Sequence, residues 1–363
     1  MRTLQKYIPD FPRLNINYLS RLTSSVGLMQ HGKYTLPNYE HGYCLDDNSR
    51  AMLLLTMVNR VSPSPRSKEL LGTYLSYINY MQLENGKFRN FLSMDHKFLD
   101  SEGTEDSFGR TIQALGFNLK HDKGGDFNEF IHEIFLKALP HCRALNSIRA
   151  VAYCLLGLSD YYQSYPENKN VETLIQELTE FLLKEYKLAK DGEWHWYEQI
   201  ITYDNAIIPL SLLRSATATG HLRASYVAQE SIAFLDKLLF KHGYLSLIGN
   251  KEWLTKARYF TQEITLETQE STYSSGQQPI EIPSLILLYK ELYILTSNAF
   301  YKNRMLHTFE WFFGKNTLGL TLYDPISKGC SDGLDEKSKN KNQGAESVIS
   351  FWSAHLYIST AFS

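Results

Sequence analysis

Two short segments of the sequence place neighbouring carboxylates and an arginine in the same order. The first reads Asp46-Asp47-Asn48-Ser49-Arg50, and the second reads Glu105-Asp106-Ser107-Phe108-Gly109-Arg110. Neighbouring carboxylates can divide the work of a general acid and a general base, because each raises the proton affinity of the other. We therefore treat Asp47 and Asp106 as the first choice for a catalytic pair, with the arginine of each segment as an ionic partner.

Each segment opens a strongly apolar run, so the alternative is that its acid only caps a helix. Asp, Asn and Ser side chains accept hydrogen bonds from the free N–H groups at helix starts. One cap needs one side chain, so a second acid exceeds that requirement. A helix N-terminus stabilises anions, and a general acid there needs a second carboxylate or burial to stay protonated. Asp46 and Glu105 are placed to supply that second carboxylate.

Similar helix starts recur six times along the chain. Each interval between them has room for an apolar helix, a turn and a returning amphipathic helix, which is the pattern of stacked helical hairpins. Six such hairpins closing on themselves form an all-α (α/α)6 toroid, and the alternative is an open helical array. Five starts carry an acid, whereas the third, at Asn146-Ser147, carries none and is expected to contribute little chemistry. The starts lie at residues 46–51, 105–110, 146–150, 203–206, 280–284 and 344–347.

The rest of the chain also reads as helices joined by polar loops. Apolar residues at three- and four-residue spacing predict helices over Arg50–Val61, Val171–Leu188, Arg223–Leu239 and Ser284–Thr296. Strand-like alternation is scarce. No linker divides the chain, so the sequence predicts one domain over residues 1–363. Long loops are expected at 263–278 and 328–343.

Aromatic residues make up 13% of the chain, and one segment sets them beside carboxylates. Trp194-His195-Trp196-Tyr197-Glu198 is followed closely by Tyr203-Asp204. A sugar stacks its C–H face on aromatic rings and bonds its hydroxyls to carboxylates and amides, so the segment suits a sugar. The alternative is a hydrophobic plug beneath a loop. Asp204 and Glu346, at two other helix starts, are the reserve catalytic carboxylates. The candidate substrate-binding residues are Asp46, Arg50, Glu105, Arg110, Trp194, Trp196, Glu198, Tyr203, Gln278, Glu281, Asp332, Asn342 and Gln343.

Charge and composition argue against several other classes of protein. The formal net charge is -2 without a basic stripe, which disfavours a nucleic-acid binder. No apolar run is long enough for a membrane span, and the N-terminus does not read as a signal peptide. Four scattered cysteines suit a reducing compartment, so a cytoplasmic location is expected. Dinucleotide and phosphate-loop motifs are missing, and the oxygen-rich run at 323–347 does not match an EF-hand, so we expect neither a cofactor nor a metal.

These features resemble the six-hairpin glycosidase superfamily, which includes unsaturated glucuronyl hydrolases and other bacterial sugar enzymes. The acidic starts at Asp46-Asp47 and Glu105-Asp106, the segment Trp194 to Trp196, and Asn342 to Ser347 carry the resemblance. It implies a carbohydrate-active protein that takes an oligosaccharide or glycoconjugate. The chain also resembles bacterial proteins found beside or fused to sugar-transfer enzymes, which implies a glycosyltransferase as a partner.

The resemblance implies a glycoside hydrolase that uses two carboxylates. Neighbouring helices lie about 8–10 Å apart, so carboxylates at their starts can approach the roughly 6.5–9.5 Å separation of an inverting enzyme. One alternative is a sugar epimerase or isomerase, which needs a base such as His41, His195 or His355, although no clear histidine pair is present. The other is a non-catalytic glycan-binding partner of a glycosyltransferase.

Overall fold

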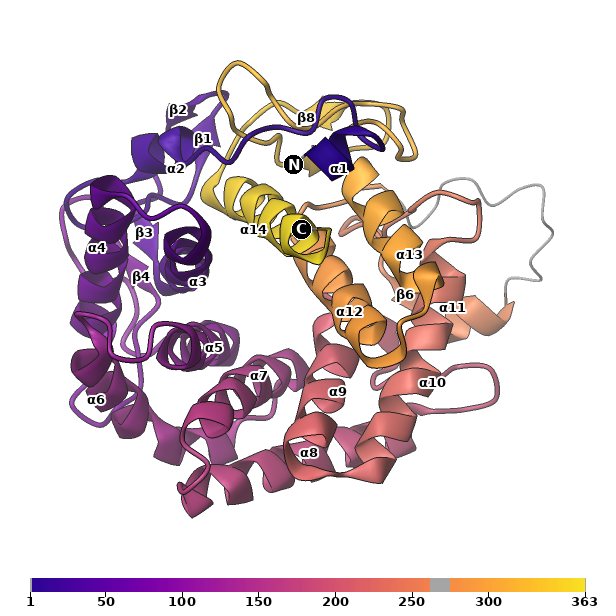
Figure 1. Cartoon of the computed structure of the whole chain (residues 1–363), viewed down its shortest axis with the longest axis horizontal. Coiled ribbons are helices and arrows are strands. Elements are labelled where there is room, and N and C mark those ends of the chain that lie inside the picture. Colours follow the sequence, from indigo (N-terminus) through magenta and orange to yellow (C-terminus); the bar gives the residue numbers. More distant parts are fainter. Residues whose placement is uncertain (1, 262–274, 363) are drawn as a thin grey trace. The chain divides into compact units, whose positions relative to one another are not determined.

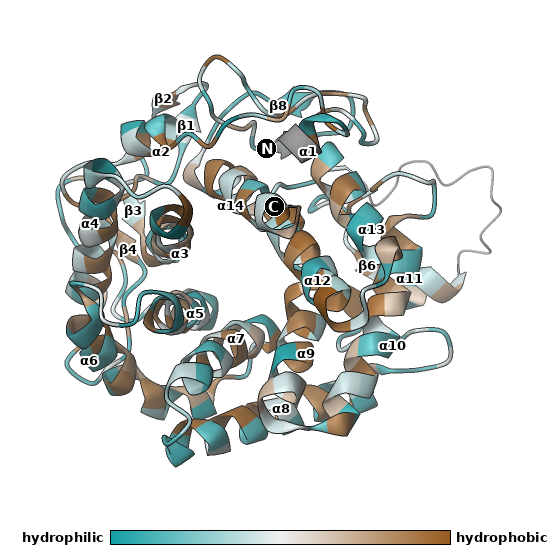
Figure 2. Cartoon of the chain, in the orientation of Figure 1, coloured by the Kyte–Doolittle hydropathy of each residue, from teal (hydrophilic) through white to brown (hydrophobic). Residues whose placement is uncertain are grey.

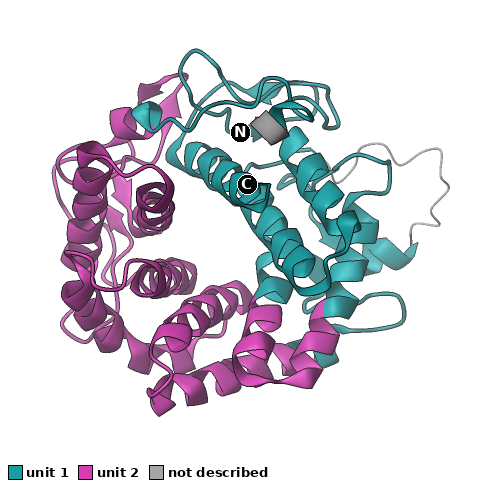
Figure 3. Ribbon diagram, viewed as in Figure 1, with its two compact units in different colours: residues 1–18, 185–210, 229–363 teal, residues 19–184, 211–228 magenta. Residues whose placement is uncertain are grey.

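The computed structural model describes residues 2–261 and 275–362, most of them helical (Figure 1). The loop expected at 263–278 therefore lies largely outside the described residues. The chain divides into two compact units (Figure 3). Unit 1 comprises residues 1–18, 185–210 and 229–363, and unit 2 comprises residues 19–184 and 211–228. A single domain over the whole chain stays a prediction.

The four helices predicted from apolar spacing are confirmed, and so are the six helix starts. The α-helices are α1 (Arg2–Gln5), α2 (Asn17–Leu22), α3 (Leu45–Val61), α4 (Pro65–Met81), α5 (Glu105–His121), α6 (Asn128–Ala138), α7 (Ile148–Ser164), α8 (Lys169–Ala189), α9 (Ile207–Thr219), α10 (Leu222–Leu239), α11 (Lys256–Thr261), α12 (Glu281–Thr296), α13 (Ala299–Glu310) and α14 (Ala345–Ala361). A 3₁₀ helix, η1, spans Leu139–Ala144.

The strands of the described residues are two residues long and form antiparallel pairs, so the expected scarcity of strands is confirmed there. The pairs are β1 (Gly32–Lys33) with β2 (Leu36–Pro37), β3 (Tyr43–Cys44) with β4 (Phe91–Leu92), β5 (Ile200–Ile201) with β6 (Leu254–Thr255), and β7 (Gly333–Leu334) with β8 (Lys339–Asn340).

In unit 2, α3 and α5 run parallel with their starts at the same end. Two buried polar contacts fix this register. Ser49 Oγ lies 2.9 Å from Thr111 Oγ1, and Asn118 Nδ2 donates to Thr56 Oγ1 at 2.9 Å. The partners are 62 residues apart in both contacts. Because the offset is constant over seven residues of each helix, the carboxylates in the first turns of α3 and α5 are neighbours.

Glycines let α5 and α7 pack with their backbones in contact. A Cβ atom on Gly116 would lie 2.1 Å from the carbonyl oxygen of Gly157, and one on Gly109 would lie 2.6 Å from that of Ala150. Real Cβ atoms do not approach a carbonyl oxygen so closely. The partners in these two contacts are separated by the same number of positions along the chain, so α7 also runs parallel to α5. Its start therefore joins the starts of α3 and α5 at one end of unit 2.

The helices that alternate with these three are amphipathic. The helix α4 packs against α3, and α6 packs against α5. Figure 2 shows hydrophilic and hydrophobic residues alternating along α4 and α6. In α4 the buried positions recur at helical spacing, as at Leu70, Tyr74 and Ile78. By contrast, α3 buries residues on all sides over most of its length, as expected for an inner helix.

In unit 1, α12 packs against both α13 and α14. Both α12 and α14 are apolar around most of their circumference, and most of their residues are buried. The sixth start opens α14, which runs to Ala361. Within the described residues, no helix combines the length and the hydrophobicity needed to cross a membrane.

Candidate functional site

The acids at the starts of α3 and α5 lie inside the first helical turn and do not cap their own helices. The N-cap of α3 is Cys44, and the N-cap of α5 is Thr104, whose hydroxyl accepts from the backbone N–H of Ser107. The alternative that Asp47 or Asp106 serves as the N-cap is therefore wrong. Carboxylates in a first turn still interact favourably with the helix dipole.

Asp46 pairs with two arginines, one on α3 and one on α5. Its Oδ1 atom lies 3.0 Å from Nε of Arg50, one turn further along α3, and 3.2 Å from Nε of Arg110 on α5. The Arg110 guanidinium also lies over the Tyr153 ring of α7, at 4.3 Å from its centroid. The Asp46 side chain remains 27% exposed, and among the described residues its Oδ2 atom makes no polar contact. A ligand could therefore bind at Oδ2.

Asp47 is more enclosed than Asp46. Its Oδ1 accepts from Arg50 Nη2 at 2.7 Å, and its Oδ2 accepts from the Cys44 thiol at 3.1 Å. Burial raises the pKa of that thiol well above its usual range, and the carboxylates of Asp47 and Asp46 raise it further. The thiol therefore stays protonated and donates to Asp47. Both oxygens of Asp47 are thus engaged within the protein, and the residue is only 5% exposed.

The start of α7, where the sequence predicted little chemistry, also contacts these side chains, and that prediction about chemistry stays open. The Ser147 hydroxyl donates to Asp106 Oδ1 at 2.8 Å and also accepts from the backbone N–H of Ala150. Asp106 is half-buried. The sequence missed Ser147 because its contact partner lies 41 residues away on another helix. We call Asp46, Arg50, Asp106, Arg110 and Ser147 the unit 2 cluster.

Several predicted substrate-binding acids instead cap a neighbouring helix. Glu105 Oε2 accepts from the backbone N–H groups of Asn146 and Ser147, at 2.8 and 2.6 Å, just before α7. Glu281 accepts from those of Asp204 and Asn205, at 2.5 and 3.2 Å, just before α9. These are the N–H groups that a helix start leaves without a partner.

Two further side chains act in the same way. Asp332 Oδ1 accepts from the backbone N–H of Gly344 at 2.6 Å and from the Ser347 hydroxyl at 2.7 Å, at the start of α14. Asn90 Oδ1 accepts from the N–H groups that open α3. Glu105, Glu281 and Asp332 each fix the start of another helix, and the substrate-binding role predicted for them stays a prediction.

The remaining predicted groups of unit 1 surround the starts of α9 and α14. Asp204 is buried and adopts a left-handed backbone conformation, with φ of 44°, at the turn into α9. Tyr203 beside it is half-buried, as are Glu346 in the first turn of α14 and Asn342 before that helix. Elsewhere in unit 1, Gln278 and Glu198 are also half-buried. The reserve carboxylates Asp204 and Glu346 therefore differ in exposure.

Trp194 and Trp196 do not offer a face to a sugar, so their predicted stacking role is wrong. Both indoles are fully buried and lie against Phe234, and Trp194 Nε1 donates to the carbonyl of Glu198 at 2.8 Å. The hydrophobic plug is the correct interpretation. Gln343 is also buried, between Ser327 and Asp324, and holds a loop rather than a ligand.

None of the three candidate histidines belongs to the first turn of an inner helix. His41 is exposed and meets His31 edge-on, with ring centroids 4.6 Å apart. His195 lies 3.3 Å from the Tyr186 hydroxyl. His355 is buried in α14 against Phe11, and burial lowers its pKa to about 4, so the ring is neutral at physiological pH.

The chain is similar in structure to carbohydrate enzymes over almost its whole length. The cellobiose 2-epimerase of Bacillus thermoamylovorans is 9% identical, with a TM-score of 0.75 over 99% of each chain. A D-mannose isomerase is 12% identical, with a TM-score of 0.71 over 99% of this chain and 96% of its own. An inactive variant of the GH76A α-1,6-mannanase of a Salegentibacter species, in complex with an α-1,6-linked mannotetraose, is 11% identical, with a TM-score of 0.63 over 99% and 98%.

No known family profile matches the sequence, and no curated protein matches it either. At such low identities the structural matches define the fold alone. The protein has the (α/α)6 fold that these structures share, and the predicted fold class is confirmed.

Proposed function

We propose that the protein is a carbohydrate-active enzyme whose site is the unit 2 cluster, and that it hydrolyses a glycosidic bond. The observation that carries the proposal is the juxtaposition of carboxylates from α3 and α5 with arginines and the Ser147 hydroxyl. Carboxylates and guanidinium groups are the side chains that bind sugar hydroxyls most strongly. The similar solved structures support the substrate class, since they include an epimerase of a disaccharide, a sugar isomerase and mannanases.

Within this cluster we propose Asp46 and Asp106 as the catalytic pair. The sequence favoured Asp47, but its oxygens are engaged by Arg50 and Cys44, whereas Asp46 keeps Oδ2 open. Asp46 lies against two guanidinium groups, which suits the carboxylate that activates water. Asp106 then protonates the leaving oxygen, in the manner of an inverting hydrolase. Asp47 becomes a positioning residue that holds Arg50 against Asp46.

One of the similar structures supports a role for consecutive acids. The mannanase described as inactive carries substitutions at two consecutive aspartates. This chain has consecutive acids at Asp46-Asp47 and again at Glu105-Asp106. Of these acids, Asp47 holds Arg50 and Cys44, and Glu105 caps α7. We infer that each pair combines one positioning acid with one sugar-facing acid.

Hydrolysis is favoured over epimerisation because the unit 2 cluster offers carboxylates and no imidazole among its five members. An epimerase needs a base that removes a proton from the carbon beside a carbonyl, and His355 is sealed in the core. The glycosyltransferase partner receives no support from the similar structures. If sugars bind and none is converted, the protein is a glycan-binding protein without catalytic activity.

The test uses the wild type and three variants, Asp46→Asn, Asp47→Asn and Asp106→Asn, on a panel of α- and β-linked oligosaccharides. Asp106→Asn should lower kcat on oligosaccharides by about 10²–10⁴-fold but retain most activity on dinitrophenyl glycosides, whose leaving group needs no proton. Asp46→Asn should lose activity on both. Full activity in both Asp46→Asn and Asp106→Asn would overturn the assignment, and deuterium uptake at C2 without cleavage would show an epimerase.

A further inference from the structure

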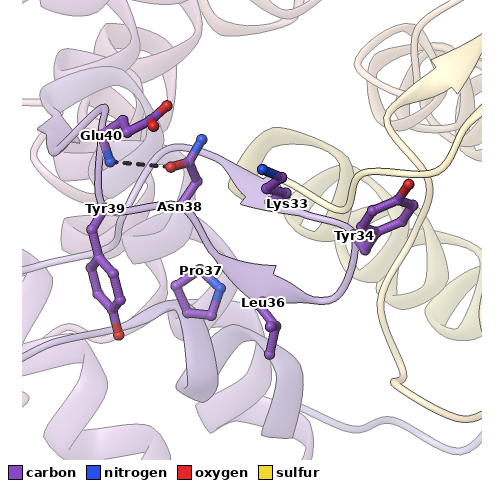
Figure 4. A pocket seen from close by; sticks show the side chains of 7 residues that line it. All are labelled: Lys33, Tyr34, Leu36, Pro37, Asn38, Tyr39 and Glu40. Atoms are coloured by element: carbon purple, nitrogen blue, oxygen red, sulfur yellow. Dashed lines mark hydrogen bonds between the residues drawn. The ribbon is translucent and has the colours of Figure 1, made fainter.

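A short hairpin ahead of α3 carries exposed aromatic and aliphatic side chains that lie outside the unit 2 cluster. Tyr34, Leu36 and Tyr39 are 60%, 65% and 64% exposed. They line a surface depression of about 610 Å³ together with Lys33, Pro37, Asn38 and Glu40 (Figure 4). Scattered apolar residues on a surface are ordinary, but three large ones on one hairpin form a patch that exposes apolar area to water.

The hairpin is attached to the end of unit 2 that carries the cluster. Its two arms pair from Gly32 with Pro37 down to Met29 with Tyr43. Tyr43 and Cys44 form β3, and Cys44 is the N-cap of α3. The ribbon therefore ends directly at the first turn that holds Asp46. Asp46 is seven positions after Tyr39 in the chain, so their Cα atoms lie at most about 25 Å apart.

Three polar side chains beside the depression keep hydrogen-bonding atoms without a partner in the described part of the chain. Neither the Lys33 ammonium nor the Glu40 carboxylate makes a hydrogen bond or ion pair there, and the Asn38 amide uses only its oxygen, which accepts from the Glu40 N–H at 3.1 Å. Figure 4 shows this bond at the edge of the hairpin. The Tyr39 ring likewise contacts no other aromatic ring among the described residues.

We propose that this hairpin is a distal sugar subsite, in which Tyr39 stacks on a pyranose ring while Asn38, Glu40 and Lys33 bond its hydroxyls. The inference rests on the proposed function, because the bound sugar is the far end of a chain whose reacting bond lies at Asp46 and Asp106. An apolar face rimmed by an amide, a carboxylate and an ammonium matches a pyranose, which has an apolar C–H face and a polar edge. None of the residues that line the depression belongs to the unit 2 cluster. The substrate is therefore an oligosaccharide, because a monosaccharide can occupy either the hairpin or the unit 2 cluster but not both.

The test compares binding of mono-, di- and tetrasaccharides of glucose and mannose to the wild type, Tyr39→Ala and Tyr34→Asn by calorimetry. Tyr34 has a left-handed φ of 53°, which asparagine tolerates, so that variant should fold normally. We expect Tyr39→Ala to weaken the best tetrasaccharide by about tenfold and Tyr34→Asn to weaken it by less, while the best monosaccharide is unchanged. Tyr39→Trp should restore the lost affinity. Tyr226→Ala, which removes a ring 62% exposed on α10, is the matched control.

The possible failures are distinguishable. If the wild type binds tetrasaccharides no more tightly than monosaccharides, or if Tyr39→Ala weakens every sugar equally, the distal subsite is wrong and the proposed function stands. If the wild type binds no sugar of the panel and Asp46→Asn changes no activity, the proposed function fails and the subsite with it. Thermal unfolding of each variant shows whether a loss of affinity comes from a loss of fold.

Discussion

The carboxylate of Asp46 on α3 lies 3.2 Å from the guanidinium of Arg110 on α5, although the two residues belong to different hairpins. Arg110 is 5% exposed, so its charge is almost withdrawn from water and requires compensation by acids. The acid that is proposed to face the sugar is thus also an acid that helps hold α3 against α5. Binding and stability are coupled at this position.

Replacing Asp46 should therefore lower stability as well as activity. Asp46→Asn should reduce the free energy of unfolding by about 1–2 kcal/mol, because two arginines lose a counter-charge that is still partly screened by water. Urea denaturation measures the change. Asp95→Asn, which removes an exposed ion pair with Lys97, is the control and should have little effect. Equal effects of the two substitutions would show that Asp46 is an ordinary surface acid.

The glycines between α5 and α7 should tolerate no side chain. Gly116→Ala should lower the free energy of unfolding by about 1–3 kcal/mol, because the new methyl group would overlap the carbonyl of Gly157. Gly72→Ala on α4 is the matched control, since its added Cβ would meet only the Phe127 ring at an ordinary 3.4 Å. That substitution should be neutral or stabilising, because alanine favours helix. Similar melting curves for both variants would contradict the packing described for α5 and α7.

Two substitutions of Glu105 distinguish a capping role from a sugar-binding role. Glu105→Ala removes the acceptor of two backbone N–H groups and should destabilise the protein by about 1–2 kcal/mol. Glu105→Gln keeps an acceptor oxygen and should cost less. If Glu105 only caps α7, any loss of sugar affinity in these variants should be explained by their loss of stability. A stable Glu105→Ala protein that no longer binds sugar would mean that Glu105 contacts the ligand directly.

Acid should destabilise the protein through His355. Burial lowers its pKa from 6.5 to about 4 in the folded state, so between these values the unfolded chain binds a proton that the folded chain does not. The contribution of His355 to the free energy of unfolding is therefore complete above pH 6.5. It is lost as the pH falls towards 4, by roughly 3 kcal/mol at most. His355→Gln should reduce the slope of unfolding free energy against pH over this range, by an amount that corresponds to at most one bound proton. A slope equal to that of the wild type would show that His355 does not titrate as described.

The helix starts were predictable from the sequence because they depend on local signals. Polar or acidic residues followed by apolar runs place α3, α5 and α12 without knowledge of any distant contact. The second use of the acids was not predictable in this way. Glu105 accepts from Ser147, and Glu281 accepts from Asp204, across 42 and 77 residues. Only the packing of one helix start beside another decides which carboxylate is occupied by the protein and which stays open.

The aromatic residues show the same limit. The alternation at Trp194 and Trp196 looks like a stacking platform in sequence, yet both rings fill a core around Phe234. Tyr34 and Tyr39, which are exposed, carry no pattern that distinguishes them from buried tyrosines. Burial depends on which elements cover a segment, and this information is not present in the spacing of a few residues.

The central claim is that a carbohydrate binds at the starts of α3 and α5 in unit 2. Its most direct test is a crystal structure of Asp106→Asn soaked with tetrasaccharides of the linkages that the wild type binds. We predict a sugar ring with hydroxyls or its glycosidic oxygen within hydrogen-bond distance of Asp46 Oδ2 and of residue 106. A sugar bound at Tyr203 and Glu346 with the unit 2 cluster empty would contradict the account.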